Sequence, residues 1–406
     1  MDPLVRTPWN GTLNWAAVRP EPDLLARRLH DEGGWLVAVG AERRHQAPPD
    51  GRWCYGHVGY DHKNALERLT SRLPAEDGFS EVLWTEPRWV LRFSDGEAAV
   101  LHAASDPAGA RSLLEALGRR PDALSPLPLD GWTLRTPKDR YLRQVEQAMA
   151  HIQRGDVYEL NYCTLRTTSA PGWDPFAGFA RLMAANPAPH AAFYRRGAHF
   201  ALCASPERYL RIADGRITAQ PMKGTRPRHA DPQEDARLAR ELAHDAKERS
   251  ENIMAVDVMR NDLSRVAAPS SVVVEELCGV HAYPRVHQMT STIVARLGEG
   301  RSTWEVVRAS FPMASMTGAP KVRAMELIES LEDMRRGLFS GTLGIIGPDG
   351  RTDLNVVIRT LTYDAASGRA GLITGSAITA GSDPAQEWAE CELKARSVTE
   401  ALGHEG

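Results

Sequence analysis

Lysine is scarce in this sequence, with six lysines against 43 arginines. The six are Lys63, Lys138, Lys223, Lys247, Lys321 and Lys394. In such a composition, arginine replaces lysine at positions where only a positive charge is needed. Each lysine still present is therefore a candidate for chemistry that needs an amine able to lose its proton. For any single lysine, chance survival is an equally good explanation.

Cysteine, basic charge and long apolar runs are also lacking. The five cysteines are odd in number, scattered and without a CxxC pair, so neither a disulfide framework nor a zinc site is indicated. A net charge of −3 does not suggest a nucleic-acid binder. No run approaches the ~20 apolar residues of a membrane span, and the first residues lack a signal-peptide pattern. We therefore expect a cytoplasmic protein that binds neither nucleic acid nor membrane.

The phosphate-binding loops GxGxxG and GxxxxGK[ST] are absent as well, although 406 residues with 42% hydrophobic side chains allow a substantial core. A proline-rich connection over residues 119–138 separates two differently patterned parts. We expect an N-terminal subdomain over residues 1–118 and a core over residues 139–402. Helices are predicted over Lys138–Arg154 and Asp174–Ala185, with a long helical pattern over Asp231–Val266.

The segment SPERYLRIADGRITAQPMKGTRPR predicts a β-hairpin that turns at Asp214-Gly215. Counting back from that turn places Glu207 opposite Met222, so Glu207 and Lys223 lie at the same open end of the hairpin. An ordinary surface ion pair would give the same pattern and is the commoner outcome.

Two pairs of glutamates have helical i, i+3 spacing. Glu248 and Glu251 form one pair, and Glu387 and Glu390 form the other on a helix that begins near Ser382 or Asp383. A single pair of this kind is usually a solvated helix face. Two pairs on helices that face each other would form a cage of carboxylate oxygens, the ligands that Mg²⁺ prefers.

Three further segments could bind an anion. In FPMASMTGAPK, Thr317 is expected to cap a helix and leave free backbone amides. The glycine-containing segment GSAITAGSD lets backbone approach a ligand. Arg359 could bind a carboxylate with two hydrogen bonds, although a surface charge at the end of a strand is an equally good explanation.

Together these segments resemble the chorismate-utilising enzymes, a family that includes the anthranilate, aminodeoxychorismate, isochorismate and salicylate synthases. The resemblance extends from about residue 140 to residue 401, on the motifs IQRGDVYELNYC, CASPERYLRI, QPMKGTRPR, KERSENIMAVDVMRNDLSRV, SMTGAPKVRAMELIE, LFSGTLGIIGPDG, NVVIRTL and SDPAQEWAECELKA. It implies an α+β fold like that of anthranilate synthase component I. In that fold, packed antiparallel sheets carry helices outside, and chorismate and Mg²⁺ lie in a central cleft.

The residue before Gly224-Thr225 indicates the activity that the resemblance implies. Aminodeoxychorismate synthases have lysine there and anthranilate synthases have alanine, and this chain has Lys223. In the implied reaction Lys223 attacks C2 of chorismate as the C4 hydroxyl leaves, and ammonia then attacks C4 and expels the lysine. Glu207 is the implied general acid and base. Because a neutral amine is required, we expect the surroundings to lower the pKa of Lys223.

The resemblance also assigns ligands. Glu251 and Glu390 would bind Mg²⁺ directly, and Glu248 and Glu387 would bind it through water. The substrate would contact the residues Thr225, Gln288, Phe339, Arg359, Gly375, Ser376, Ala377 and Lys394. The sequence has no GxCxG nucleophile region able to hydrolyse glutamine, so ammonia is expected from a separate glutamine amidotransferase subunit.

Several positions depart from the family pattern. Gln288 replaces a histidine, Phe339 replaces a tyrosine, and Gly375-Ser376-Ala377 replaces GGG or GAG. Glu159 stands where isochorismate synthases use lysine to activate water, which disfavours that reaction. Anthranilate synthesis remains an alternative, and a non-catalytic chorismate-binding regulatory subunit is an alternative of another class.

Overall fold

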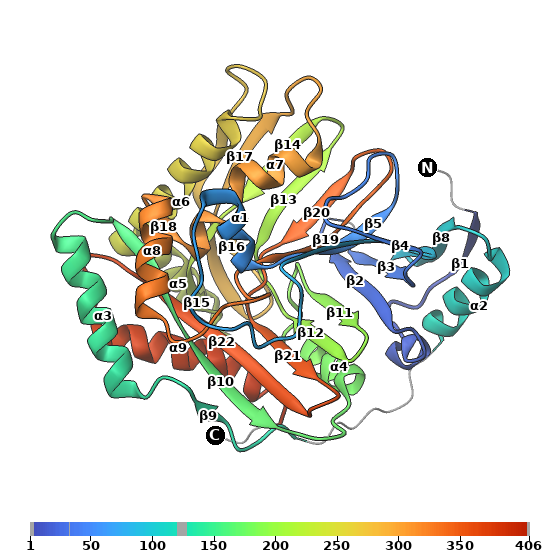
Figure 1. Cartoon of the computed structure of the whole chain (residues 1–406), viewed down its shortest axis with the longest axis horizontal. Helices are drawn as coiled ribbons and strands as arrows, with labels where there is room; N and C mark the ends of the chain where they lie inside the picture. Colours follow the sequence, from blue (N-terminus) through green and yellow to red (C-terminus); the bar gives the residue numbers. More distant parts are fainter. Residues whose placement is uncertain (1–3, 32, 120–127, 404–406) are drawn as a thin grey trace.

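The fold is built on two antiparallel sheets, seen in the computed structural model for residues 4–31, 33–119 and 128–403 (Figure 1). In hydrogen-bonding order the 12-stranded sheet consists of β1 (Val5–Pro8), β8 (Glu97–Ala103), β7 (Trp89–Ser94), β3 (Gly34–Val39), β2 (Asp23–Leu29), β11 (Ala192–Arg196), β12 (His199–Cys203), β21 (Thr360–Asp364), β22 (Arg369–Ile378), β10 (Glu159–Ser169) and β18 (Gly318–Ala319), with β9 (Thr133–Leu134) beside β10. The 10-stranded sheet consists of β15 (Met222–Pro227), β17 (Val286–Arg296), β14 (Arg216–Gln220), β13 (Arg208–Ala213), β20 (Thr352–Asn355), β19 (Thr342–Ile346), β5 (Cys54–Val58), β6 (Val82–Glu86) and β4 (Arg43–His45), with β16 (Val273–Ala282) also paired to β17.

Helices cover the outer faces of these sheets. They are α1 (Lys63–Glu67), α2 (Pro107–Gly118), α3 (Lys138–Gln153), α4 (Pro175–Ala185), α5 (Pro232–His244), α6 (Ala246–Ser264), α7 (Thr303–Ser310), α8 (Lys321–Leu331) and α9 (Pro384–Thr399), with the short turns η1 (Trp15–Val18), η2 (Tyr60–His62) and η3 (Ala314–Met316). Figure 1 shows α3, α8 and α9 together at one side of the molecule. The expected α+β class, with packed antiparallel sheets and outer helices, is confirmed.

Strand side chains alternate between two buried faces. Leu24 packs into an outer cluster with residues of α2 and α4, whereas Leu25, the next residue of β2, packs into a cluster between the sheets. That inner cluster joins Leu25 to Tyr55 and Leu343 of the other sheet. Burying each leucine side chain contributes roughly 1.5–3 kcal/mol, which explains why these strands are apolar on both faces.

The first 118 residues contribute strands to both sheets. Strand β2 pairs with β11, and β5 pairs with β19. Part of the expected connection, residues 120–127, lies outside the described residues. The division into a subdomain over 1–118, a connection and a core over 139–402 stays a prediction.

The predicted helices at 138–154 and 174–185 are confirmed as α3 and α4, and the helix expected from Ser382 or Asp383 is confirmed as α9. The prediction of a single long helix over Asp231–Val266 is wrong, because the helix is interrupted at Asp245 and continues as a second helix. The Asp245 carboxylate accepts hydrogen bonds from the backbone N–H groups of Lys247 and Glu248 and so begins a second helix. This interruption sets where α6 begins, and therefore toward which side of the helix Glu248 and Glu251 point.

The helix cap expected from Thr317 is also wrong. Gly318 and Ala319 form β18, which pairs with β10, so α8 begins only at Lys321. The Thr317 hydroxyl donates instead to the carbonyl of Met313 at 3.1 Å. Lys321 bonds the Asp262 carboxylate and the Ser310 carbonyl.

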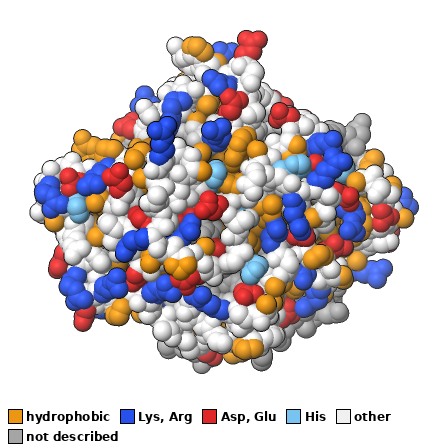
Figure 2. All heavy atoms as spheres, in the orientation of Figure 1, with side chains coloured by type: hydrophobic (Ala, Val, Ile, Leu, Met, Phe, Trp, Pro, Cys, Tyr) orange, Lys and Arg blue, Asp and Glu red, His pale blue; other side chains and the backbone are white. Residues whose placement is uncertain are grey.

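The surface mixes charges of both signs. On the face drawn in Figure 2, Lys and Arg side chains lie among Asp and Glu side chains, without a continuous basic stripe. In the described part of the chain, no helix has both the length and the apolar character needed to cross a membrane.

Candidate active site

A cavity of about 890 Å³ brings most of the predicted site residues together. Residues of β10, β15, β22, α6 and α9 line it, together with η3 and the loop after β20. Every residue predicted from the sequence for catalysis, metal binding or substrate binding lines this cavity except Ser376 and Glu387. Elements far apart in the chain therefore build one site.

The predicted hairpin places Glu207 and Lys223 in this cavity. Strands β13 and β14 pair Ala213 with Arg216, as the Asp214-Gly215 turn predicts. A bulge between Arg208 and Arg211 shifts the pairing by one residue at the open end, so the expected opposition of Glu207 and Met222 is inexact. The backbone N–H of Met222 still donates to the Glu207 carboxylate.

The Lys223 ammonium is held among carboxylates. Its Nζ lies 2.7 Å from Glu159 Oε1 and 3.7 Å from Glu251 Oε2, and its side chain is only 9% exposed. Burial lowers the pKa of Lys223, but the charges of Glu159 and Glu251 raise it by more, so its pKa lies above the ordinary value. The surroundings therefore raise the pKa of this lysine, whereas the sequence analysis expected them to lower it. Glu159 provides a proton acceptor in direct contact with the amine.

Glu207 is a buried carboxyl group with a single fixed side-chain donor. Its residue is 4% exposed, and the Ser315 hydroxyl donates to Oε1 at 2.7 Å. Burial raises the pKa of Glu207 to about 7, against the opposing effects of Ser315 and the Lys223 charge. A carboxyl group with this pKa is suited to give and take a proton near neutral pH.

The two glutamate pairs lie on helices that face each other across the cavity. Lys247 of α6 bonds Glu387 of α9 at 2.8 Å and lies 3.8 Å from Glu251. Burial, followed by the nearby Glu390 charge, raises the pKa of Glu248. Burial also raises the pKa of Glu251 to about 7. The carboxylates thus share one electrostatic environment in which an added cation would be favourable.

The donor chemistry of these pairs fits Mg²⁺. Glu251 Oε1 and Glu387 Oε2 are buried and accept no hydrogen bond, which leaves two hard oxygen atoms available to a cation. Across the described ranges, no three acidic, histidine or cysteine side chains converge closely enough to form a ready-made metal site. Lys247 lies between the pairs, so its ammonium would have to move for Glu251 and Glu387 to bind one ion.

Cationic groups line the other side of the cavity. Arg359 donates to the Ser397 hydroxyl at 3.2 Å, and no Asp or Glu among the described residues forms an ion pair with it. Burial lowers the pKa of Arg359, as expected of a guanidinium without a bonded carboxylate. Lys394 donates to the Gly375 carbonyl at 2.9 Å and pairs with Glu390 at 2.6 Å. Both side chains line the cavity, and their role in binding a substrate stays a prediction.

Residues Gly375 to Ala377 continue strand β22 and do not form a turn. Gly375 pairs with Cys163 of β10, and an added Cβ there would lie 2.4 Å from the cysteine sulfur. Ala377 lines the cavity, whereas the Ser376 hydroxyl bonds the Tyr141 hydroxyl at 2.9 Å, away from the cavity. A role for this segment in substrate binding stays a prediction.

Thr225, Gln288 and Phe339 line the cavity near Lys223. Gln288 Nε2 lies 3.4 Å from the Thr225 hydroxyl, and Gln288 Oε1 is buried without a hydrogen bond. Gly224 has φ +79°, and a Cβ at that position would lie 2.9 Å from Leu242 and 3.1 Å from Glu248. Glycine therefore lets β15 pass close to α5 and α6 and brings Lys223 against the α6 carboxylates.

Phe339→Tyr would restore a phenol hydroxyl in this wall of the cavity, where Phe339 is buried. A hydrogen bond to substrate contributes about 0.5–1.5 kcal/mol net, so we expect the KM for chorismate to fall several-fold with the same product. Steady-state kinetics measure the KM, and chromatography identifies the product. A changed product, or complete inactivity, would contradict the expected role of Phe339.

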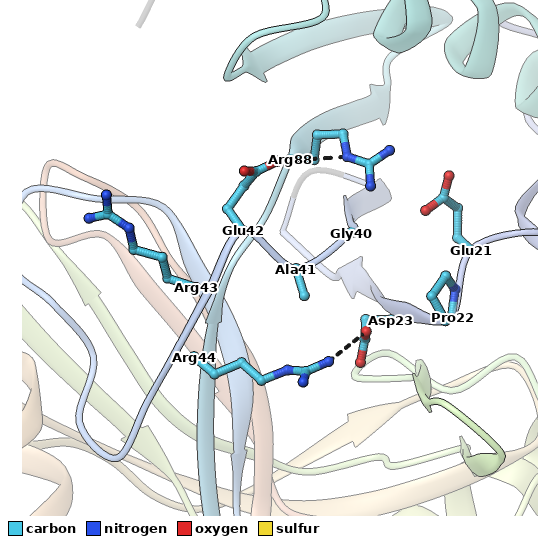
Figure 3. Close-up of a pocket in the computed structure, with 9 residues that line it drawn as sticks. All are labelled: Glu21, Pro22, Asp23, Gly40, Ala41, Glu42, Arg43, Arg44 and Arg88. Carbon is cyan, nitrogen blue, oxygen red and sulfur yellow. Dashed lines mark hydrogen bonds and ion pairs between the residues drawn. The ribbon is translucent and has the colours of Figure 1, made fainter.

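A second hollow, of about 390 Å³, has a different chemistry (Figure 3). Among its charged side chains, Arg44 pairs with Asp23 at 2.9 Å and Arg88 pairs with Glu42 at 3.7 Å. None of the nucleophilic or acid–base residues discussed above lines it. We therefore place the active site in the larger cavity.

Sequence reasoning missed the contacts of three side chains. In the sequence, Glu159 served only to disfavour the isochorismate synthase reaction. Nothing there indicated that its carboxylate accepts a hydrogen bond from Lys223. Ser315 carried no signal, since it meets Glu207 across the cavity from a distant segment. Lys247 did carry a signal, because it is one of the six lysines and precedes Glu248.

Comparison with known proteins agrees with this geometry. The profile of the chorismate binding enzyme family matches residues 26–400. The chain belongs to this family. The match includes both glutamate pairs, Lys223 and Glu207, and extends through most of the N-terminal strands.

Relatives of this chain are named either aminodeoxychorismate synthase or anthranilate synthase. It is 42% identical over 78% of its length to an aminodeoxychorismate synthase of Streptomyces griseus, of which it spans 44%. It is 37% identical over 86% of its length to aminodeoxychorismate synthase component 1 of Klebsiella aerogenes, covering 76% of that protein. It is also 36% identical to anthranilate synthase component 1 of Thermus thermophilus, over 90% of this chain and 80% of that one.

Solved structures share the fold. Anthranilate synthase component I of Streptococcus pneumoniae aligns with a TM-score of 0.77 at 24% identity, over 98% of this chain and 92% of that one. The menaquinone-specific isochorismate synthase MenF of Escherichia coli aligns with the same TM-score at 19% identity, over 98% and 94% of the two chains. At these identities the likeness establishes the fold.

Proposed function

We propose that this enzyme aminates chorismate at C4 to give 4-amino-4-deoxychorismate. The observation that carries the proposal is the buried Lys223 amine, which lines the larger cavity together with the Glu207 carboxyl group. Similarity to proteins named aminodeoxychorismate synthase supports it. The product is a precursor of the kind used in 4-aminobenzoate and folate biosynthesis.

The reaction begins with a proton transfer and a nucleophilic attack. Lys223 gives one proton to Glu159, whose carboxylate lies 2.7 Å away, and the free amine attacks C2 of chorismate. The ring double bonds shift, and the C4 hydroxyl leaves as water with a proton from Glu207. Lys223 is then bonded covalently to C2.

Ammonia completes the exchange. It attacks C4 of the adduct, the double bonds shift back, and the bond between C2 and Lys223 breaks. Glu207, now ionised, accepts the proton that the attacking ammonia must lose. The overall change is chorismate plus ammonia to 4-amino-4-deoxychorismate plus water.

The glutamate pairs would hold Mg²⁺ during these steps, and Arg359 and Lys394 would hold the substrate. Glu251 and Glu390 would bind Mg²⁺ directly, with Glu248 and Glu387 around it. Bound Mg²⁺ would neutralise the ring carboxylate of chorismate and make C2 a better electrophile. Arg359 and Lys394 would bind the second carboxylate by charge-assisted hydrogen bonds.

We expect this chain to use free ammonia and to depend on a separate glutamine amidotransferase subunit for glutamine. Purified protein with chorismate, Mg²⁺ and an ammonium salt should form 4-amino-4-deoxychorismate, which a pyruvate-releasing lyase then converts to 4-aminobenzoate. The same mixture with glutamine in place of ammonium should give no product. Liquid chromatography with mass spectrometry separates the products.

The other outcomes decide between the alternatives. Anthranilate formed without added lyase would replace the proposal with anthranilate synthesis, as in the Thermus thermophilus relative. Tight chorismate binding without turnover would indicate a non-catalytic binding subunit. Glutamine-dependent product from the purified chain alone would contradict the need for a partner.

A further inference from the structure

The Glu207 carboxyl group is fixed at one oxygen atom by a side chain with no assigned role. Ser315 Oγ donates to Glu207 Oε1 at 2.7 Å, and both residues are at least nine-tenths buried. Two lysines, Lys223 of β15 and Lys394 of α9, are the charged groups that act on this carboxyl group. The other donor is the backbone N–H of Met222, which cannot be removed by a side-chain substitution.

Ser315 itself is held rigidly. The Asn161 side chain donates to the Ser315 carbonyl at 2.9 Å, and Arg336 donates to the carbonyl of Met316 at 2.7 Å. Arg336 is in turn bonded to Glu332 at 2.6 Å within a fully buried ion pair. The short turn η3 therefore presents the Ser315 hydroxyl at a fixed point in the cavity wall.

The backbone of Glu207 is fixed to a similar degree. Its N–H donates to the Ser205 hydroxyl at 3.2 Å, and its carbonyl accepts from the N–H of Val356 at 3.1 Å. The remaining freedom lies in the side-chain torsions, which Ser315 restricts at Oε1. An oxygen that accepts this hydrogen bond is the carbonyl-like oxygen of the neutral acid, so the transferable proton belongs on Oε2.

We propose that Ser315 is a positioning residue, whose hydroxyl holds Glu207 Oε1 so that Oε2 carries the proton given to the leaving C4 hydroxyl. The inference rests on the proposed function, because it assigns that proton to Glu207. Ser315 acts only through Glu207. Its removal should affect the proton-transfer step more than the binding of chorismate.

The test compares Ser315→Ala with Ser315→Thr, which keeps the hydroxyl, and with Ser310→Ala. Ser310 is an equally buried serine whose hydroxyl bonds Tyr209 at 2.7 Å and which does not line the cavity. The pH profile of kcat is measured as chorismate consumption, and thermal unfolding of each variant is recorded. We expect Ser315→Ala to lower kcat about tenfold with little change in KM.

The pH profile gives the sharper readout. The Ser315 hydrogen bond favours the ionised form of Glu207 and so lowers its pKa, which burial has raised to about 7. Its loss raises that pKa further, so the alkaline limb, where the general acid is lost, should move up by about one pH unit. Ser315→Thr should restore the wild-type limb, and Ser310→Ala should keep it.

An unshifted limb in folded Ser315→Ala would overturn the proposal, and so would an equal shift in Ser310→Ala. If Ser315→Thr is folded yet shifted like Ser315→Ala, the hydroxyl is not the cause and the proposal also fails. The proposed function is judged separately, from the product of the wild-type protein. An anthranilate product would reject C4 amination and leave the Ser315 test intact, since chorismate consumption still reports loss of the C4 hydroxyl.

Discussion

Lys223→Ala is expected to lower the rate of 4-amino-4-deoxychorismate formation by on the order of 10⁴-fold or more, since it removes the C2 nucleophile. Chorismate and Mg²⁺ should still bind with nearly wild-type affinity, because Arg359, Lys394 and the glutamate pairs are untouched. The shortened side chain also leaves room for ammonia at C2, so traces of a 2-amino isomer or anthranilate are expected. Steady-state kinetics, binding titration and product chromatography measure these effects.

Lys223→Arg should be equally inactive, although it keeps the positive charge beside Glu159. Arginine cannot lose its proton in a protein, so no proton passes to Glu159 and no neutral nitrogen is available to attack C2. The matched control is Lys138→Ala, an exposed lysine at the start of α3, which should behave as the wild type. If either Lys223 variant kept wild-type rate and product, Lys223 would be a structural cation and the anthranilate-type reaction would be the better explanation.

Glu251→Gln and Glu390→Gln are each expected to abolish turnover almost completely and to weaken Mg²⁺ binding. Each change removes one carboxylate from the cage, and with it the several kcal/mol that a bound cation contributes to stabilising negative charge on the substrate. Isothermal titration with Mg²⁺ in the presence of chorismate measures binding, and the ammonia-dependent assay measures turnover.

Both variants should remain folded, Glu390→Gln because the Glu390 side chain is 42% exposed. Burial raises the pKa of Glu251 to about 7, so its ionised form is costly in the fold, and an uncharged isostere removes that cost. Glu275→Gln, at an exposed residue of β16 that pairs with Arg216, is the control and should leave turnover unchanged. Equal activity in EDTA and in Mg²⁺ would refute the assignment of both glutamate pairs.

Local sequence patterns predicted which residues belong to the candidate site. The contacts between those residues became visible only in the fold. The Asp214-Gly215 turn defined a hairpin, and i, i+3 spacing defined two acidic helix faces, because both signals depend on neighbours in the chain. The scarcity of lysine was informative, since Lys223, Lys247 and Lys394 all line the cavity. The hairpin and the acidic helix faces were inferred from neighbours in the chain, and the lysines from the composition of the whole sequence.

The error about Lys223 arose where distant residues meet. The pKa of Lys223 was expected to fall, but Glu159 from β10 and Glu251 from α6 lie against its amine and raise the pKa. No pattern in the sequence indicates that these two carboxylates approach Lys223. The missed break at Asp245 has a local cause, because an aspartate inside a helical pattern can cap a new helix.

The pairing of β2 with β11 and of β5 with β19 has a consequence for how this chain folds as it is synthesised. Strand β5 (Cys54–Val58) leaves the ribosome long before its partner β19 (Thr342–Ile346) exists. The early strands therefore carry unpaired edges while most of the chain is still being made, and their pairing closes very long loops. A topology with so many non-local contacts folds slowly, so release of nascent chains should depend more on chaperones than in a protein of similar size built from local contacts.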